Sequence, residues 1–142
     1  MEGARQKAGQ RAAYEAFREL HENGRLFVMP NAWDAASARV FVARGFRALG
    51  SSSAALAMMR GVQDGTRGVS RAAAIAHAAD LARFSGLPVN GDLEDGFGSE
   101  PEQVRATVEA AIAGGLAGLG IEDTTADPEQ PIHGFDHAVC RV

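Results

Sequence analysis

The sequence has very few lysines and cysteines, and this scarcity excludes several kinds of chemistry. Lys7 is the only lysine among 14 basic residues, and it lies in a polar N-terminal segment. Schiff-base aldolases, pyridoxal-phosphate enzymes and P-loop nucleotidases need a lysine held in a site, so these classes are almost excluded. Cys140 is the only cysteine, which excludes an internal disulfide and a multi-thiolate metal site. The chemistry must therefore depend on carboxylates, hydroxyls, histidines and backbone amides.

The sequence also lacks a long apolar run, an excess of basic residues and the apolar segment of a signal peptide. Its 142 residues include 14 basic and 18 acidic side chains, which gives a net charge of −4. We therefore expect no transmembrane helix and no nucleic-acid binding, since no basic stripe is available for a phosphate backbone. The N-terminus alternates charges with alanines, so a cytoplasmic protein with small-molecule partners is predicted.

Strand-like and helix-like segments alternate after an N-terminal helix. Residues 1–24 are expected to form this helix, and residues 25–142 about four strand–helix units of a partial barrel. The expected strands are 26–30, 47–51, 88–92 and 116–121, and the expected later helices are 34–44, 53–60, 70–84, 101–113 and 135–142. This alternation predicts an α/β fold with a parallel sheet covered by helices. Four units make either a small open sheet or half of an eight-stranded barrel.

Polar side chains follow each expected strand. Both architectures place ligands at the C-terminal edge of their strands, so the sequence predicts one convergent acidic site. The residues concerned are Asp34 after the first strand, Ser51, Ser52 and Ser53 after the second, Asp92 and Glu94 after the third, and Glu122 and Asp123 after the fourth.

The most informative stretch is Asp92-Leu93-Glu94-Asp95-Gly96-Phe97-Gly98. Carboxylates at i and i+2 leave an extended strand pointing the same way, and the glycines let the backbone turn tightly over a ligand. Glu122 is expected beside Asp92 and Glu94. Three carboxylates without imidazole or thiolate partners suit a hard ion, which predicts Mg²⁺, with Mn²⁺ second. For each carboxylate alone, the alternative is a helix cap or a solvated loop.

The other candidates each have a simpler alternative. Free amides and hydroxyls at Ser51–Ser53 can hold a carboxylate or phosphoryl group, or a serine can cap the following helix. Asp34 is alternatively a helix cap, and Asp64-Gly65 a turn. No catalytic residue is assigned. The candidate is His133, the only histidine in a loop close to the acidic residues, and its alternative is an exposed loop histidine.

Short motifs along the chain share their order and spacing with a known family. They are Pro30-Asn31-Ala32-Trp33-Asp34, Ser51-Ser52-Ser53, Asp64-Gly65, Asp92–Gly98 and Gly120-Ile121-Glu122-Asp123. In these motifs, which cover about residues 26–142, the chain resembles the isocitrate lyase and phosphoenolpyruvate mutase superfamily, in its methylisocitrate lyase-like branch.

The resemblance implies a TIM barrel, usually in a dimer or tetramer, and a Mg²⁺-dependent lyase or mutase. Such enzymes make or break a carbon–carbon or carbon–phosphorus bond next to a 2-oxo acid, through an enolate held on Mg²⁺. Asp92 would bind the metal directly, and metal-bound waters would be held by Glu94, Glu122 and Asp64. The substrate carboxylate would be bound by Ser51, Ser52 and Ser53, and the pocket shaped by Trp33 and Asp34.

The sequence departs from the family pattern in two ways. The lyases follow the equivalent of Glu122 with a gating loop that carries a Lys-Lys-Cys-Gly-His or Lys-Arg-Cys-Gly-His signature, whereas residues 124–134 contain neither lysine nor cysteine. We therefore do not expect isocitrate or methylisocitrate cleavage by the usual mechanism.

The second departure is length, because closing eight strands takes roughly twice this chain. We expect half a barrel that forms a homo-oligomer. The alternative is an inactive, truncated half-barrel that retains metal or carboxylate binding or serves as an association module. An unrelated open sheet of receiver type is a further alternative.

Overall fold

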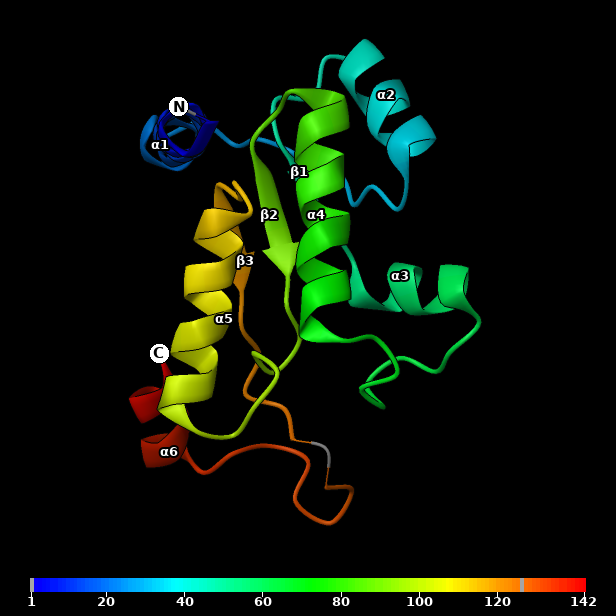
Figure 1. Ribbon diagram of the computed structural model, residues 1–142, viewed down its shortest axis with the longest axis vertical. Coiled ribbons are helices and arrows are strands. Elements are labelled where there is room, and N and C mark those ends of the chain that lie inside the picture. The colour runs from blue at the N-terminus through cyan, green and yellow to red at the C-terminus, as the bar shows by residue number, and fades with distance from the viewer. Residues whose placement is uncertain (1, 126) are drawn as a thin grey trace.

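A computed structural model of the chain describes residues 2–125 and 127–142, with side chains described from residue 8 onward. Within the described residues, its helices and strands follow the order that the sequence predicts, except that no strand stands between the first two helices (Figure 1). The elements are α1 (Glu2–Glu22), α2 (Ala35–Ala43), β1 (Leu49–Gly50), α3 (Ser53–Arg60), α4 (Arg71–Ser85), β2 (Val89–Asp92), α5 (Pro101–Ala113), β3 (Gly118–Gly120) and α6 (Phe135–Arg141).

Local signals in the sequence fix most helix ends. The side chains of Asp34, Ser52 and Ser70 each accept a hydrogen bond from a backbone amide in the first turn of α2, α3 and α4, at 2.7, 3.3 and 3.3 Å. Such caps satisfy amide groups that have no partner within the helix. At the other end, Gly61 and Gly86 close α3 and α4 in the left-handed conformation, with φ of 66° and 68°.

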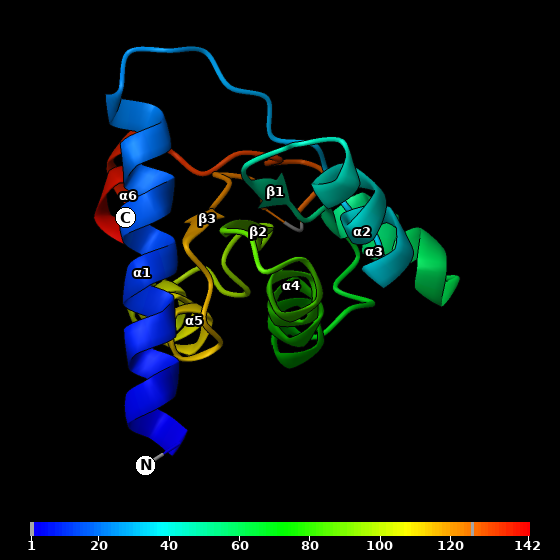
Figure 2. The same ribbon diagram turned by 90° about the horizontal axis from the view of Figure 1, so that it is seen from above.

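The strands form one parallel sheet in the order β1-β2-β3. Helices α4 and α5 lie on the same side of it (Figure 2). The core between sheet and helices includes Leu49, Leu81 and Val89, each no more than 1% exposed. The expected α/β fold with a parallel sheet and a helical layer is therefore confirmed.

The expected strand at residues 26–30 is wrong. A single parallel bridge joins Asn31 to Gly50, where the Gly50 amide donates to Pro30 O at 3.0 Å and the Ala32 amide to Gly50 O at 2.9 Å. Leu26 is 98% exposed. The apolar run ends beside the edge strand β1, and pairing at one position is too little to make the run a strand.

Helix α1 packs beside the sheet and α5 (Figure 2). A Cβ atom at Gly118 would lie 2.6 Å from Phe17 Cε1, so β3 needs a glycine where α1 approaches it. Gln10 also donates to the carbonyl of Leu116 at 3.1 Å. Among the described residues, no helix combines the length and the apolar character needed to cross a membrane.

Candidate functional site

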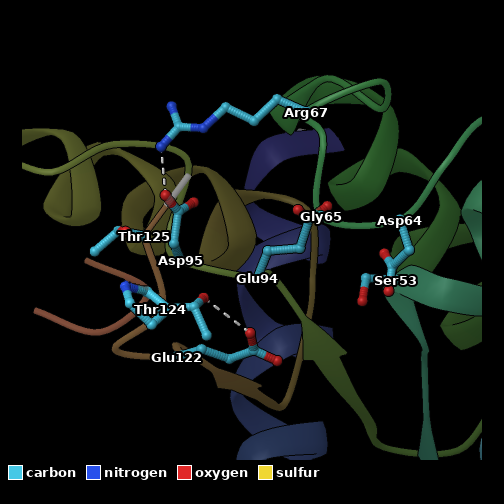
Figure 3. Close-up of a pocket in the computed structure, with 10 residues that line it drawn as sticks. Ser53, Asp64, Gly65, Arg67, Glu94, Asp95, Glu122, Thr124 and Thr125 are labelled. Atoms are coloured by element: carbon cyan, nitrogen blue, oxygen red, sulfur yellow. Dashed lines mark hydrogen bonds and ion pairs between the residues drawn. The ribbon is translucent and has the colours of Figure 1, made fainter. Parts of the chain in front are cut away.

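An acidic pocket of about 300 Å³ lies where the chain leaves β2 and β3. Figure 3 shows Glu94 between Asp64 and Ser53 on one side and Asp95, Glu122 and Thr124 on the other. The lining combines carboxylates with one guanidinium: Ser53, Asp64, Gly65, Arg67, Glu94, Asp95, Glu122, Thr124, Thr125 and Pro131. The structure thus brings together four of the residues singled out in the sequence, Ser53, Asp64, Glu94 and Glu122.

Asp92, the last residue of β2, has a carboxylate oriented by backbone amides. The amide of Ser53 donates to its Oδ2 at 2.8 Å, and the amide of Glu94 donates to its Oδ1 at 3.2 Å. The backbone amide of Asp92 itself donates to Ser51 Oγ at 2.9 Å. One bond to each oxygen leaves further lone pairs free. Asp92 is therefore a fixed, half-buried acceptor that adjoins the pocket through its two neighbours.

Glu94 is the centre of the negative charge. Burial is the main cause that raises its pKa, and the charges of Asp64, Asp95, Asp92 and Glu122 raise it further, in that order. Its backbone lies in the left-handed region, with φ of 49°. Strain of this kind costs free energy and persists only where the surroundings hold it. The pocket therefore concentrates charge that a cation would stabilise.

Arg67 and Asp95 form an ion pair at the rim of this pocket (Figure 3). The Asp95 side chain is 10% exposed and also accepts from the amide of Phe97 at 2.9 Å. Sequence reasoning did not assign a role to either residue. The available signal was that Arg67 is the only basic residue in the loop of residues 61–68. The pair neutralises Asp95 and leaves the other carboxylates without an arginine partner among the described residues.

The three serines have different roles in the structure. Ser51 is buried and accepts from the backbone of Asp92. Ser52 caps α3, which is the alternative that its position allowed. Ser53 alone lines the pocket, so the structure does not bring all three hydroxyls to one ligand.

Trp33 and Asp34 are not among the residues that line the acidic pocket. Hydrogen bonds from the Ser37 amide and hydroxyl lower the pKa of Asp34, whose carboxylate caps α2. The amide of Trp33 donates to Ser37 Oγ at 3.1 Å, and its carbonyl oxygen lies 2.8 Å from His77 Nε2. Both residues are thus engaged in fixing the start of α2.

His133 lies outside the pocket lining, against His137, with ring centroids 4.9 Å apart. Its backbone amide donates to Asp123 O at 2.8 Å. Burial is the main cause that lowers the pKa of the imidazole, and the positive charges of Arg141 and His137 lower it further. The backbone bond to Asp123 therefore holds the loop at this position.

Across residues 8–125 and 127–142, no three His, Cys, Asp or Glu side chains stand close enough to hold a metal ion together. A cage of three direct carboxylate ligands, the plainest form of the predicted metal site, is therefore not present in the part of the chain that the structure describes.

Comparisons with known proteins settle the family. The model described as phosphoenolpyruvate phosphomutase matches residues 17–142. The chain belongs to this family. An uncharacterised protein of Mycobacterium tuberculosis is 41% identical over 112 residues, which are 79% of this chain and 42% of the relative. The 2-methylisocitrate lyase of Halalkalibacterium halodurans is 33% identical over 119 residues, which are 83% of this chain and 39% of the enzyme.

Solved structures agree with this assignment and confirm the superfamily resemblance. An oxaloacetate acetylhydrolase in complex with oxalate superposes with a TM-score of 0.80 and 28% identity, over 91% of this chain and 46% of that one. A phosphonopyruvate hydrolase in complex with oxalate and Mg²⁺ shares the fold, with a TM-score of 0.84, 22% identity and coverage of 91% and 45%. These neighbours are TIM barrels, and the chain spans slightly less than half of each.

Proposed function

We propose that this chain carries the metal and carboxylate site of a lyase or mutase that acts on a 2-oxo acid or its carboxylate adduct. The observation that carries the proposal is the concentration of carboxylates around Glu94, whose pKa is raised by burial and by four acidic neighbours. The lining side chains that could ligate a metal ion all offer oxygen atoms, and none of the described lining residues is a histidine or a cysteine. Such a set of ligands favours Mg²⁺, with Mn²⁺ as the second choice. The inactive alternative receives no support from the named enzymes among the relatives.

The donor set fits Mg²⁺ held partly through water. Asp92 would bind the ion directly, because two backbone amides already orient its carboxylate. Glu94, Glu122 and Asp64 would hold metal-bound waters, since Mg²⁺ keeps several waters and binds few carboxylates directly. When bound, Mg²⁺ would stabilise negative charge that develops on the oxygen of a 2-oxo acid, as in an enolate.

The substrate carboxylate is assigned to Ser53 and Arg67 at the pocket. Ser53 lines the pocket, whereas Ser51 and Ser52 are not among its lining residues. The Arg67 side chain is 44% exposed, and an arginine offers five donors, of which the ion pair with Asp95 uses one. Three expectations from the sequence stay predictions. They are the roles of Trp33 and Asp34 in shaping the pocket, the catalytic role of His133, and a cytoplasmic location.

We further propose a homo-oligomer formed through the face next to β3. Among the described residues β3 pairs only with β2. Phe135, Val139 and Val142 of the adjoining C-terminal segment are large apolar residues left exposed. Exposed strand edges and contiguous apolar surface favour association. The mass in solution tests this: Phe135→Ser is expected to shift a dimer toward monomer, and a wild-type monomer at all concentrations would overturn it.

The activity is tested with a panel of 2-oxo acids and hydroxy-diacids, measuring release of pyruvate, glyoxylate, succinate or oxalate. We expect product only with Mg²⁺ or Mn²⁺, and none from Asp92→Asn. Asp127→Asn is the matched control, because Asp127 is exposed and does not line the pocket. Absence of turnover across the panel would reject the enzymatic function of this chain.

A further inference from the structure

Arg141, near the end of α6, is an unusually buried arginine. The residue is only 4% exposed, and its buried Nε atom has no hydrogen-bond partner among the described residues. The Nη2 atom donates to the carbonyls of Asp95 and of Gly98, the latter at 3.0 Å, and Nη1 donates to the carbonyl of Glu122 at 3.4 Å. The guanidinium therefore contacts the loop after β2 and the segment after β3 together.

No ion pair explains this burial among the described residues. The arginines that form salt bridges in this part of the chain are Arg11, Arg18, Arg67, Arg83 and Arg105. Burying a charge costs several kcal/mol unless hydrogen bonds and nearby opposite charge compensate. At Arg141 the compensation that the structure shows comes from three backbone carbonyls, those of Asp95, Gly98 and Glu122. Because burial of this guanidinium costs free energy, the contacts that it alone provides indicate its role.

The two segments that Arg141 joins are the ones that carry most of the pocket's carboxylates. In the loop after β2, Arg141 binds the carbonyl of Asp95, which follows Glu94 directly. In the segment after β3, it binds the carbonyl of Glu122. All three of these acidic residues line the pocket. Their carboxylates carry like charges and line one pocket, so they repel one another. The other backbone links between the segments are Glu122 N to Glu94 O at 2.8 Å and Leu93 N to Gly120 O at 3.3 Å.

We propose that Arg141 is a positioning residue for the acidic pocket: from α6 it ties the loop after β2 to the end of β3 and holds their carboxylates together against repulsion. Its effect on metal binding rests on the proposed function, whereas its effect on the two segments does not. Arginine suits the role because its planar fork presents donors in several fixed directions, while lysine has a single nitrogen at the end of its chain.

The test compares Arg141→Met, which keeps the apolar stem, with Arg141→Lys, which keeps the charge. The matched control is Arg105→Met on α5, whose side chain is 77% exposed. Amide hydrogen exchange is measured in residues 94–99 and 120–124, with α4 as the internal reference. We expect exchange about 10-fold faster or more in both segments for Arg141→Met, a smaller increase for Arg141→Lys and none for Arg105→Met. Faster exchange equally throughout the chain, or in neither segment, would overturn the proposal.

Mg²⁺ binding gives a second readout that a merely structural role would not move. The Kd for Mg²⁺ is expected to weaken by about 10- to 100-fold in Arg141→Met, as for other groups that orient metal ligands, with partial recovery in Arg141→Lys. If wild type does not bind Mg²⁺, the proposed function fails, and exchange still decides the role of Arg141. If Arg141→Met does not fold, Arg141→Lys is compared with wild type in its place. An Arg141→Lys variant with the same hydrogen exchange and the same Kd for Mg²⁺ as wild type would then reject the inference.

Discussion

The loop after β2 and the segment after β3 both line the acidic pocket, yet they are built differently. In the first, Asp95, Gly96 and Gly98 are buried, and bonds reach it from Arg67, Thr107 and Arg141. Residues 127–132 of the second are all exposed, and this segment bonds mainly to itself, as in Thr125 N to Pro131 O at 2.9 Å. We call the loop of residues 93–99 the fixed wall, because distant parts of the fold hold it. We call residues 123–125 and 127–132 the free wall, because they bond mainly within their own segment.

This difference bears on function, because the free wall is also where the chain lacks the family's lysine and cysteine signature. The fixed wall holds Glu94 and Asp95, and Asp92, the proposed metal ligand, lies at its base. Within one family, the proposed metal site combined with a different opposite wall would be a physical route to a different reaction. The predictions below compare equivalent changes in the two walls.

The largest effect is expected from Asp92→Asn at the base of the fixed wall. It removes the charge that two backbone amides orient, so the Kd for Mg²⁺ should weaken by at least about 100-fold, roughly 2.7 kcal/mol. Asp123→Asn, an exposed change next to Glu122 in the free wall, should leave the Kd within about 3-fold. Titration calorimetry measures both, and equal losses would contradict the distinction.

Next comes a pair of aspartates with the same local turn. Asp95 and Asp127 each accept from the amide two residues ahead, both at 2.9 Å, but only Asp95 is buried and paired with arginine. Asp95→Ala should lower the free energy of unfolding by about 1–3 kcal/mol, because it leaves buried donors unpaired. Asp127→Ala should cost less than about 0.5 kcal/mol. Urea denaturation compares them, and similar costs would show that burial does not separate the walls.

A threonine pair gives a smaller effect. The hydroxyl of buried Thr107 donates to Gly96 O at 2.6 Å, whereas Thr125 bonds within the free wall. Thr107→Val keeps the shape but leaves that carbonyl unpaired, so we expect a loss of about 1–2 kcal/mol. Thr125→Val should change stability by about 0.5 kcal/mol at most. The same denaturation experiment applies, and a larger loss at Thr125 would reverse the assignment of the walls.

The smallest effect is a gain in stability. The raised pKa of Glu94 means that protonation of this carboxyl stabilises the folded state. This stabilisation is fully present below the ordinary pKa of the carboxyl, and it is lost as the pH rises through the pKa of the folded state. Glu94→Gln should therefore stabilise the metal-free chain at neutral pH by about 0.2–1 kcal/mol, after allowing for solvent screening. It should also reduce the stabilisation by Mg²⁺. Thermal unfolding between pH 4 and 8 tests this, and a destabilised variant would contradict it.

The sequence predicted features that depend on neighbouring residues. Caps at Asp34, Ser52 and Ser70 follow from short patterns. The approach of Glu94 to Glu122 follows from the parallel sheet, because both residues come after the C-terminal ends of neighbouring strands. The prediction of a strand at 26–30 was wrong, because a strand needs a paired neighbour, and an apolar run alone does not show whether one is present. The ion pair of Arg67 with Asp95 and the burial of Arg141 were missed, since no local pattern marks these contacts, which join residues 19 to 46 positions apart.

The most direct test of the central claim, that this pocket binds Mg²⁺ and a carboxylate together, is thermal unfolding of the chain with neither ligand, either alone, or Mg²⁺ plus oxalate. A ligand that binds only the folded state raises the Tm. The account predicts one cooperative transition whose Tm rises most with both ligands, a rise that Asp92→Asn abolishes. A Tm indifferent to both, or a rise that persists in Asp92→Asn, would contradict it.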